Sequence, residues 1–332
     1  MDIIRKTNSN GNFYYVNKRS KKKVKNLNLL KHIKSLRIPP AYKTVQISSN
    51  MQSKVQAKGI DTKERSQYIY NKDYIEQQSE IKFDDLIYFG KKIKRIRKDV
   101  NTNIKSCVND RSKIQNKECL ISLVIFLIDR CNFRVGNEKY KKLYNSYGVT
   151  TLNKKHFEFL KNNIKISFVG KKGVINQSNV ENKDVVTIID RLCNFDFEYI
   201  FSYKDNKNQV FRITEKHIND FLKKYHKTLT VKMFRTWAAN YILIKEILDH
   251  PLPNNQTQAS KYIREIIKKA ANKMHHSKNV SKKSYMNNKI IDLYLESPEK
   301  FKNVINDFRR SNGKLPTINA IVNKLLQYLS KN

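Results

Sequence analysis

The sequence predicts an α+β protein, with a small β-rich N-terminal domain over residues 1–80 and a larger, mainly α-helical domain over residues 81–332 that carries a β-hairpin. Three observations predict this. Residues 1–80 combine turn dipeptides with short alternating stretches, which are typical of strands. From about residue 82 apolar residues recur at helical spacing, and near residue 164 alternation returns beside paired glycines. The change of period along the chain indicates two domains.

The N-terminal strands are predicted from turn signals and alternation. In "NGNFYYV" an Asn-Gly turn precedes a short aromatic strand. After Pro39–Pro40 the apolar residues Val45 and Ile47 alternate with polar ones. The stretch "KVQAKGIDTKERSQYIY" contains two strand-like segments on either side of the turn at 59–61.

The larger domain begins with an amphipathic helix and a buried one. In "FDDLIYFGKKIKRIRKDV" one helical face gathers the apolar residues Leu86, Phe89, Ile93 and Ile96. "KECLISLVIFLIDRCNFRVGN" is apolar on nearly all sides and stops at Gly136, which predicts a central core helix.

A hairpin and further helices follow. Ile164, Ile166 and Phe168 share one face of a strand, and the turn between Gly170 and Gly173 would place Lys171 and Lys172 at the hairpin tip. Helices are expected around 215–226 and 229–248, and again in "SKYIREIIKKAANKMHH" beyond a break at two prolines.

The charge of the chain restricts its partners. There are 67 Lys and Arg against 29 Asp and Glu, a net charge of +38. Such a balance points to a polyanion, and nucleic acid is the commonest one. A membrane is not expected as a partner, because the longest apolar run, Ile121 to Ile128, is too short to span a bilayer. The first ten residues lack the apolar stretch of a signal peptide.

The cysteines and histidines predict no metal site. Cys107, Cys119, Cys131 and Cys193 form no C-x-x-C pair, and we expect packed, reduced thiols rather than a disulfide framework or a zinc site. No H-x-x-x-H pattern occurs.

The stretch "HHSKNVSKKSYM" contains a candidate nucleophile. A tyrosine surrounded by cations ionises more readily, and the same cations attract phosphate, so Tyr285 is a candidate for attack on a phosphodiester. Taken alone, this stretch is better explained by an exposed tyrosine on a basic, solvated surface segment.

A tyrosine that cleaves a phosphodiester needs partners, and the sequence offers a candidate for each role. The non-bridging oxygens need fixed cationic donors, for which arginine is best suited, and the leaving alkoxide needs a general acid. Arg134 and Arg235 are candidate donors, His276 can add a hydrogen bond, and Lys171 is a candidate acid. Each also has an ordinary explanation, as a salt-bridged arginine, a solvated lysine or a helix-capping histidine.

The order and local context of these residues carry a family resemblance. Arg134 in "RVGN", Lys171 in "FVGKKG", Arg235 in K-x-x-R-T and a histidine nine residues before Tyr285 resemble type IB DNA topoisomerases, most of all the compact class of poxviruses, giant viruses and bacteria. "NEKYKKLYNSYGVTTLNKKH", "LRIPPAYKTVQI" and "SKKSYM" are similar to further stretches of that family. The resemblance covers roughly residues 35 to 300.

The resemblance implies a fold and a mechanism. A catalytic domain like that of tyrosine recombinases and topoisomerases IB, over residues 81–332, would form a C-shaped DNA clamp with a DNA-binding domain over residues 1–80. Tyr285 would form a 3′-phosphotyrosine, Arg134, Arg235 and His276 would hold the non-bridging oxygens, and Lys171 would protonate the 5′-oxygen. Strand rotation and religation would relax supercoils with no cofactor, neither ATP nor a divalent metal.

The resemblance also implies partners and a location. The expected partner is double-stranded DNA, and a monomer is expected because one chain supplies every catalytic group. Action inside a cell is expected, in a viral replication compartment or a virion, since abundant Asn, Ile and Lys hint at an A+T-rich viral genome. The implied DNA contacts are Gln67, Tyr68 and Tyr70 in the N-terminal domain, and Lys139, Tyr140, Lys232 and Asn240 near the scissile strand.

Two alternatives and two assignments stay open. A tyrosine recombinase shares this residue order, but its second arginine usually lies in the pattern H-x-x-R. In this chain Lys232 occupies the position of that histidine, which favours a topoisomerase. A non-enzymatic DNA-coating protein would explain the net charge, but it does not need the ordered set of Arg, Lys, Arg, His and Tyr. "MHH" replaces the expected G-H, so His275 competes with His276, and Lys172 directly follows Lys171.

Overall fold

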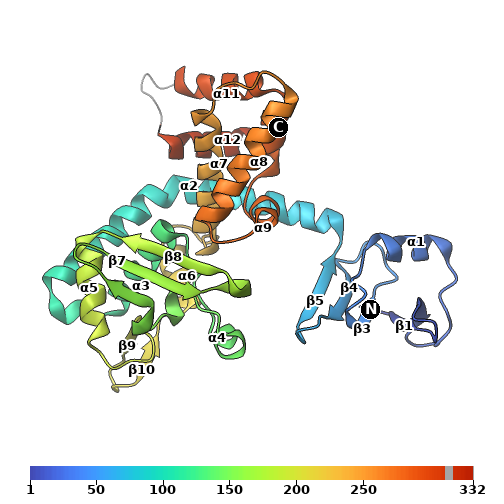
Figure 1. The fold of residues 1–332 in the computed structure, drawn as a ribbon, viewed down its shortest axis with the longest axis horizontal. Helices are drawn as coiled ribbons and strands as arrows, with labels where there is room; N and C mark the ends of the chain where they lie inside the picture. Colours follow the sequence, from blue (N-terminus) through green and yellow to red (C-terminus); the bar gives the residue numbers. More distant parts are fainter. Residues whose placement is uncertain (311–316, 332) are drawn as a thin grey trace. The chain divides into compact units, whose positions relative to one another are not determined.

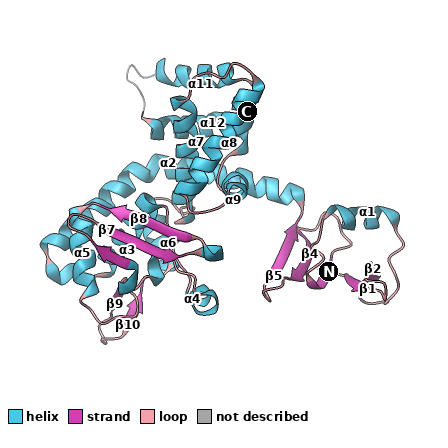
Figure 2. Cartoon of the chain, in the orientation of Figure 1, coloured by secondary structure: helices cyan, strands magenta, loops and turns pink. Residues whose placement is uncertain are grey.

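The computed structural model describes residues 1–310 and 317–331, without the side chains of 309 and 310. The chain divides into two compact units, Met1–Lys82 and Phe83–Asn332 (Figure 1). Strands dominate the first unit, and helices make up most of the second (Figure 2). The predicted α+β class is confirmed.

The N-terminal unit is a five-stranded antiparallel sheet covered by one helix. Its strands are β1 Ile3–Thr7, β2 Phe13–Asn17, β3 Lys43–Ile47, β4 Val55–Ile60 and β5 Ser66–Tyr70, in the order β2-β1-β3-β4-β5. The helix α1, Leu27–Ser35, contributes Ile33 to a core that it shares with Ile3, Val45, Ile47 and Ala57. The alternation of Val45 and Ile47 thus marks the buried face of β3, as the sequence predicts.

Two long helices begin the second unit's core. Helix α2, Lys72–Asn109, starts before the unit boundary and buries Leu86, Phe89, Ile93 and Ile96, the face predicted from the sequence. Helix α3, Lys117–Cys131, is buried on nearly all sides, which confirms the predicted central helix. It ends at Cys131, before Gly136, because Asn132 adopts a left-handed conformation at its C-cap.

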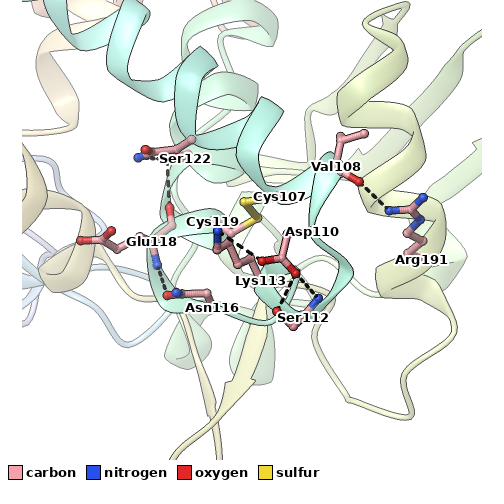
Figure 3. The surroundings of a disulfide bond; sticks show 11 residues. Cys107, Val108, Asp110, Ser112, Lys113, Asn116, Glu118, Cys119, Ser122 and Arg191 are labelled. Carbon is pink, nitrogen blue, oxygen red and sulfur yellow. Dashed lines mark hydrogen bonds and ion pairs between the residues drawn. A yellow bond between two sulfur atoms is a disulfide. The ribbon is translucent and has the colours of Figure 1, made fainter.

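A disulfide joins these two helices and corrects the expectation of four reduced cysteines. Cys107 in the last turns of α2 and Cys119 at the start of α3 are bonded, with their Cα atoms 6.2 Å apart (Figure 3). The chain reverses direction in the short connection between the two helices, which contains the 3-10 turn η1, Arg111–Lys113. This reversal places the two cysteines next to each other. Their spacing in sequence does not reveal this proximity. Cys131 and Cys193 are free thiols, and burial raises the pKa of each to about 11.

The predicted hairpin is part of a three-stranded antiparallel sheet. Its strands are β6 Phe157–Phe159, β7 Ile164–Val169 and β8 Ile175–Val180, in the order β6-β7-β8. The tip is the 3-10 turn η4, Lys171–Gly173, where Lys172 and Gly173 have φ values of +65° and +76°. Ile164, Ile166 and Phe168 are buried on one face of β7, as predicted.

The elements between α3 and the last helices are short. Helix α4 is Glu138–Tyr144, and the 3-10 turns η2 Val149–Thr151 and η3 Lys154–His156 precede the sheet. Helix α5, Lys183–Cys193, follows β8, and a two-stranded sheet of β9 Ser202–Lys204 and β10 Val210–Arg212 leads to α6, Glu215–Lys223.

The remaining helices form the C-terminal part of the second unit. They are α7 Lys232–Asp249, α8 Gln256–Lys273, α9 Lys278–Ser284, α10 Asn288–Glu296, α11 Pro298–Arg310 and α12 Ile318–Lys331. Trp237 of α7 is buried and donates to Asn319 Oδ1 of α12 at 3.0 Å. A Cβ at Gly90 of α2 would meet the Trp237 ring at 2.5 Å, so only glycine lets the two helices approach this closely. None of the described helices is long and apolar enough to cross a membrane.

Candidate active site

Arg134 lies on a tightly packed loop between α3 and α4. Its carbonyl accepts from Val149 N at 2.9 Å, and the Val135 carbonyl accepts from Thr150 N at 2.6 Å. A Cβ on Gly148 would lie 2.6 Å from the Arg134 carbonyl oxygen, so a glycine is needed there. These contacts fix the backbone of the Arg134 loop, residues 132–136, while the arginine side chain stays half-buried.

Arg235 is a buried cation with unused donors. It lies in the first turns of α7 and is 4% exposed. Its NH2 donates to the Met274 carbonyl at 2.7 Å, but Nε and NH1 are buried with no hydrogen-bond partner among the described residues. Burial and the nearby charge of Arg134 lower the pKa of Arg235 to about 10, so it still carries its charge at neutral pH.

Tyr285 lies directly beside Arg235 and His276. The rings of His276 and Tyr285 stack with centroids 4.8 Å apart, and Arg235 Cζ lies 5.4 Å from the Tyr285 ring centroid. Burial alone would raise the pKa of Tyr285, but the charges of Arg235 and Arg134 outweigh it, so the pKa lies below its ordinary value. The arrangement favours the phenolate, which is the nucleophilic form.

His276 offers a further unused nitrogen. Its Nε2 is buried without a hydrogen-bond partner among the described residues. Burial, assisted by the charge of Arg235, lowers the pKa of His276 to about 4, so the ring is neutral at pH 7 in the absence of a ligand. His275, the competing candidate, instead has its Nε2 3.1 Å from the Cys131 carbonyl, and its ring does not stack on Tyr285.

Lys171 stands apart from this group. It is exposed at the hairpin tip, and within the described residues no hydrogen bond or ion pair joins it to Arg134, Arg235, His276 or Tyr285. The structure therefore brings four of the five predicted residues together. The neighbouring Lys172 has a left-handed backbone and is exposed as well, so both lysines remain candidates for the acid.

Asn240, one of the predicted DNA contacts, is buried beside the Tyr285 backbone. Its side chain is fully buried in α7, and Nδ2 donates to the Tyr285 carbonyl at 2.9 Å and to the Thr236 carbonyl at 2.8 Å. Its Oδ1 accepts from Asn287 N at 2.8 Å. Asn240 therefore has no exposed face for DNA and instead holds the backbone on both sides of Met286. The sequence signal of this role is an asparagine within the largely apolar stretch of α7, five residues after Arg235.

The other predicted contact residues are exposed, except for Gln67, which is half-buried. In the first unit, Tyr68 and Tyr70 are 46% and 40% exposed on β5, and Gln67 Nε2 donates to Asp61 Oδ2 at 2.9 Å. Lys58 Nζ lies 5.6 Å from the Tyr68 ring centroid. The β5 surface thus combines aromatic faces with positive charge, a combination suited to nucleic acid.

The second unit exposes its own predicted contacts. Lys139 and Tyr140 are exposed on α4, and Lys232 at the start of α7 is exposed and pairs with Glu215 at 3.1 Å. These positions are accessible to a large ligand.

Comparison with known proteins identifies the family. The family model described as eukaryotic DNA topoisomerase I, catalytic core, matches residues 71–312, and that of the bacterial DNA topoisomerase IB N-terminal domain matches residues 12–61. The chain is 32% identical over 287 residues to DNA topoisomerase 1B of Acanthamoeba polyphaga mimivirus, covering 84% of this chain and 83% of the relative. It is 26% identical over 247 residues to DNA topoisomerase 1B of Vaccinia virus (strain Copenhagen), covering 71% of each. An ordered cationic site around a tyrosine, on a chain with these relatives, leads to one conclusion: the protein belongs to the type IB DNA topoisomerases.

Proposed function

We propose that this enzyme relaxes supercoiled duplex DNA by transient cleavage of one strand, with Tyr285 as the nucleophile and a 3′-phosphotyrosine as the intermediate. The observation that carries the proposal is a set of three buried nitrogens, Arg235 Nε, Arg235 NH1 and His276 Nε2, for which the described part of the chain offers no hydrogen-bond partner. Buried polar groups in folded proteins are nearly always satisfied, and a missing ligand explains such exceptions. An oxyanion between these nitrogens and the Tyr285 ring would satisfy all three.

The proposed ligand is the scissile phosphodiester. The two arginines would bind its non-bridging oxygens, and His276 in its Nε2–H form would donate one more hydrogen bond. The approach of an anion raises the pKa of a histidine, so the low pKa of His276 in the free enzyme does not oppose this role. These donors are fixed before DNA arrives and act where charge develops in the transition state.

The chemistry balances without a further reactant. The Tyr285 phenolic proton passes to water, the phenolate oxygen bonds to phosphorus, and the bond from phosphorus to the 5′-oxygen breaks. The leaving 5′-oxygen receives a proton from Lys171 at the hairpin tip, which must come close to the DNA for this step. After strand rotation the 5′-hydroxyl attacks the phosphotyrosine and restores the phosphodiester.

We propose that neither ATP nor a divalent metal is required. One phosphoester is exchanged for another, so the bond energy is kept in the intermediate. The guanidinium groups of Arg134 and Arg235 supply the positive charge that metal ions supply in many phosphoryl-transfer sites. One chain holds all the proposed groups, so we propose a monomer that acts inside cells, in a viral replication compartment or a virion.

DNA binding is proposed to use surfaces of both units. The exposed Tyr68 and Tyr70 of β5, with Gln67, would contact the duplex from the first unit, and Lys139, Tyr140 and Lys232 from the second. Lysines contacting phosphates contribute affinity without sequence information.

A covalent adduct tests the proposal most simply. Wild-type protein is incubated with a duplex in which the strand beyond the cleavage site is short enough to dissociate, and protein–DNA adducts are resolved by denaturing electrophoresis. Tyr285→Phe should form none, whereas Tyr241→Phe, a half-buried tyrosine elsewhere on α7, should match wild type. Adducts formed by Tyr285→Phe, or an attachment through the 5′-phosphate, would contradict the proposal.

A further inference from the structure

We propose that His275 is a positioning residue, which ties the Arg134 loop to the turn that presents His276 and so holds the phosphate-binding groups in one arrangement. The inference rests on the proposed function of that site. It is carried by the backbone conformation of His275 and by the contacts of its side chain.

The backbone at His275 belongs to the turn that ends α8. His276 N donates to the Ala271 carbonyl at 3.1 Å, and His275 N donates to the Asn272 carbonyl at 3.1 Å. This pair of hydrogen bonds defines a Schellman motif, in which the residue at the position of His275 is left-handed and usually glycine. His275 indeed has a φ of +53°. This chain therefore places a histidine where the backbone favours glycine, at a conformational cost that needs a compensating contact.

The side chain of His275 makes contacts that a glycine cannot make. Its Nε2 lies 3.1 Å from the carbonyl oxygen of Cys131, the last residue of α3, and donates to it in the Nε2–H form. Its ring packs against Phe133, the residue directly before Arg134, with centroids 5.4 Å apart. Phe133 is fully buried and packs in turn on Phe168 of β7 at 4.9 Å. His275 thus connects the end of α8 to the base of the Arg134 loop.

The three consecutive residues 274–276 each contact a different part of the site. The Met274 carbonyl accepts from Arg235 NH2 at 2.7 Å, His275 contacts Cys131, and the His276 ring stacks on Tyr285 at 4.8 Å. A shift of this turn relative to α3 would move Arg235 and His276 away from Arg134 together. Misplacement by about 1 Å can lower a rate on the order of 100-fold, so the link at His275 bears on cleavage rather than on binding.

The test separates positioning from folding. His275→Gly relieves the cost of the left-handed backbone and also loses the contacts that offset this cost, so the variant should fold with a melting temperature close to that of wild type. His275→Asn, which also tolerates this conformation, is a second variant with a shorter side chain. The control is Asn208→Gly, a residue with φ +60° in the β9–β10 turn of the same unit.

Single-turnover cleavage rates and DNA dissociation constants are measured for all four proteins. We expect His275→Gly and His275→Asn to cleave at least about tenfold more slowly than wild type, with affinities within about threefold, because many other phosphate contacts remain. Asn208→Gly should match wild type in both. A His275→Gly rate equal to wild type, or a slower rate accompanied by a matching fall in melting temperature, would overturn the inference. Failure of the wild type itself to form the Tyr285 adduct would instead refute the proposed function.

Discussion

Replacement of Arg235 by lysine should separate transition-state stabilisation from DNA binding. Lysine keeps the positive charge but offers one ammonium where arginine offers a planar fork. In the structure the guanidinium NH2 donates to the Met274 carbonyl, whereas Nε and NH1, the two donors proposed to bind the phosphate, have no hydrogen-bond partner among the described residues. An ammonium at this depth can satisfy the carbonyl or one phosphate oxygen well, but not both. At least one fixed donor to the developing charge is therefore lost.

The size of the effect follows from the number of donors lost. Removal of one preorganised donor to a developing oxyanion typically costs about 3–4 kcal/mol, or about 10²–10³ in rate. Affinity for DNA should change by only about threefold, since the charge remains and one phosphate contact among many is weakened.

The assay is single-turnover cleavage with enzyme in excess over a duplex, together with the dissociation constant of the same duplex. Arg191→Lys is the matched control, because Arg191 NH1 also donates to a backbone carbonyl, that of Val108, but lies outside the site. It should cleave at the wild-type rate. An Arg235→Lys rate within threefold of wild type, or an equal loss in rate and affinity, would refute the assignment of Nε and NH1 to the scissile phosphate.

Three further predictions concern the support and the acid of the site. Asn240→Ala should lower the free energy of unfolding by roughly 1–3 kcal/mol and slow cleavage, because the Tyr285 carbonyl loses its hydrogen-bond donor. Wild-type values in urea denaturation and in cleavage assays would contradict this. Lys171→Ala should slow the cleavage of ordinary DNA by about 10²–10⁴-fold. The variant should still cleave DNA with a 5′-bridging sulfur at near the wild-type rate, since a thiolate leaves without a proton. If only Lys172→Ala shows this loss and rescue, Lys172 is the acid. Burial lowers the pKa of His156 to about 4, so as the pH falls the unfolded chain binds a proton near pH 6.5, before the native state does. The free energy of unfolding should therefore be highest above pH 6.5 and fall as the pH drops toward 4, by up to about 3 kcal/mol more in wild type than in His156→Gln. Equal pH dependence of the two proteins in urea titrations would contradict this.

Local periodicity predicted the elements that bury one continuous face. The buried positions of α2 and the inward face of β7 follow from spacing, because each side chain's direction is set by its own helix or strand. Helix α3 was predicted instead from a nearly continuous apolar run, and it is buried on nearly all sides. The disulfide between Cys107 and Cys119 was missed, since it depends on how the chain returns between two helices. No local pattern encodes that return.

In the candidate site, too, some residues could be predicted from the sequence and others depend on how the helices pack. Residue types and their order pointed to Arg134, Arg235, His276 and Tyr285, and the structure brings these four together. The burial of Asn240 against the Tyr285 backbone could not be predicted, because it depends on how α7 packs against the segment after α9. Lys171 is exposed on its hairpin, and its proposed role as the acid stays a prediction that the variants above test.

Relaxation of a supercoiled plasmid in EDTA without ATP tests the central claim most directly. Wild type and Tyr285→Phe are compared at equal DNA occupancy, with positively and negatively supercoiled substrates. We predict that wild type relaxes both and that the variant binds DNA but relaxes neither. Relaxation by Tyr285→Phe, or a wild-type enzyme that acts only when ATP or a divalent metal is added, would contradict a metal-independent phosphotyrosine mechanism at this site.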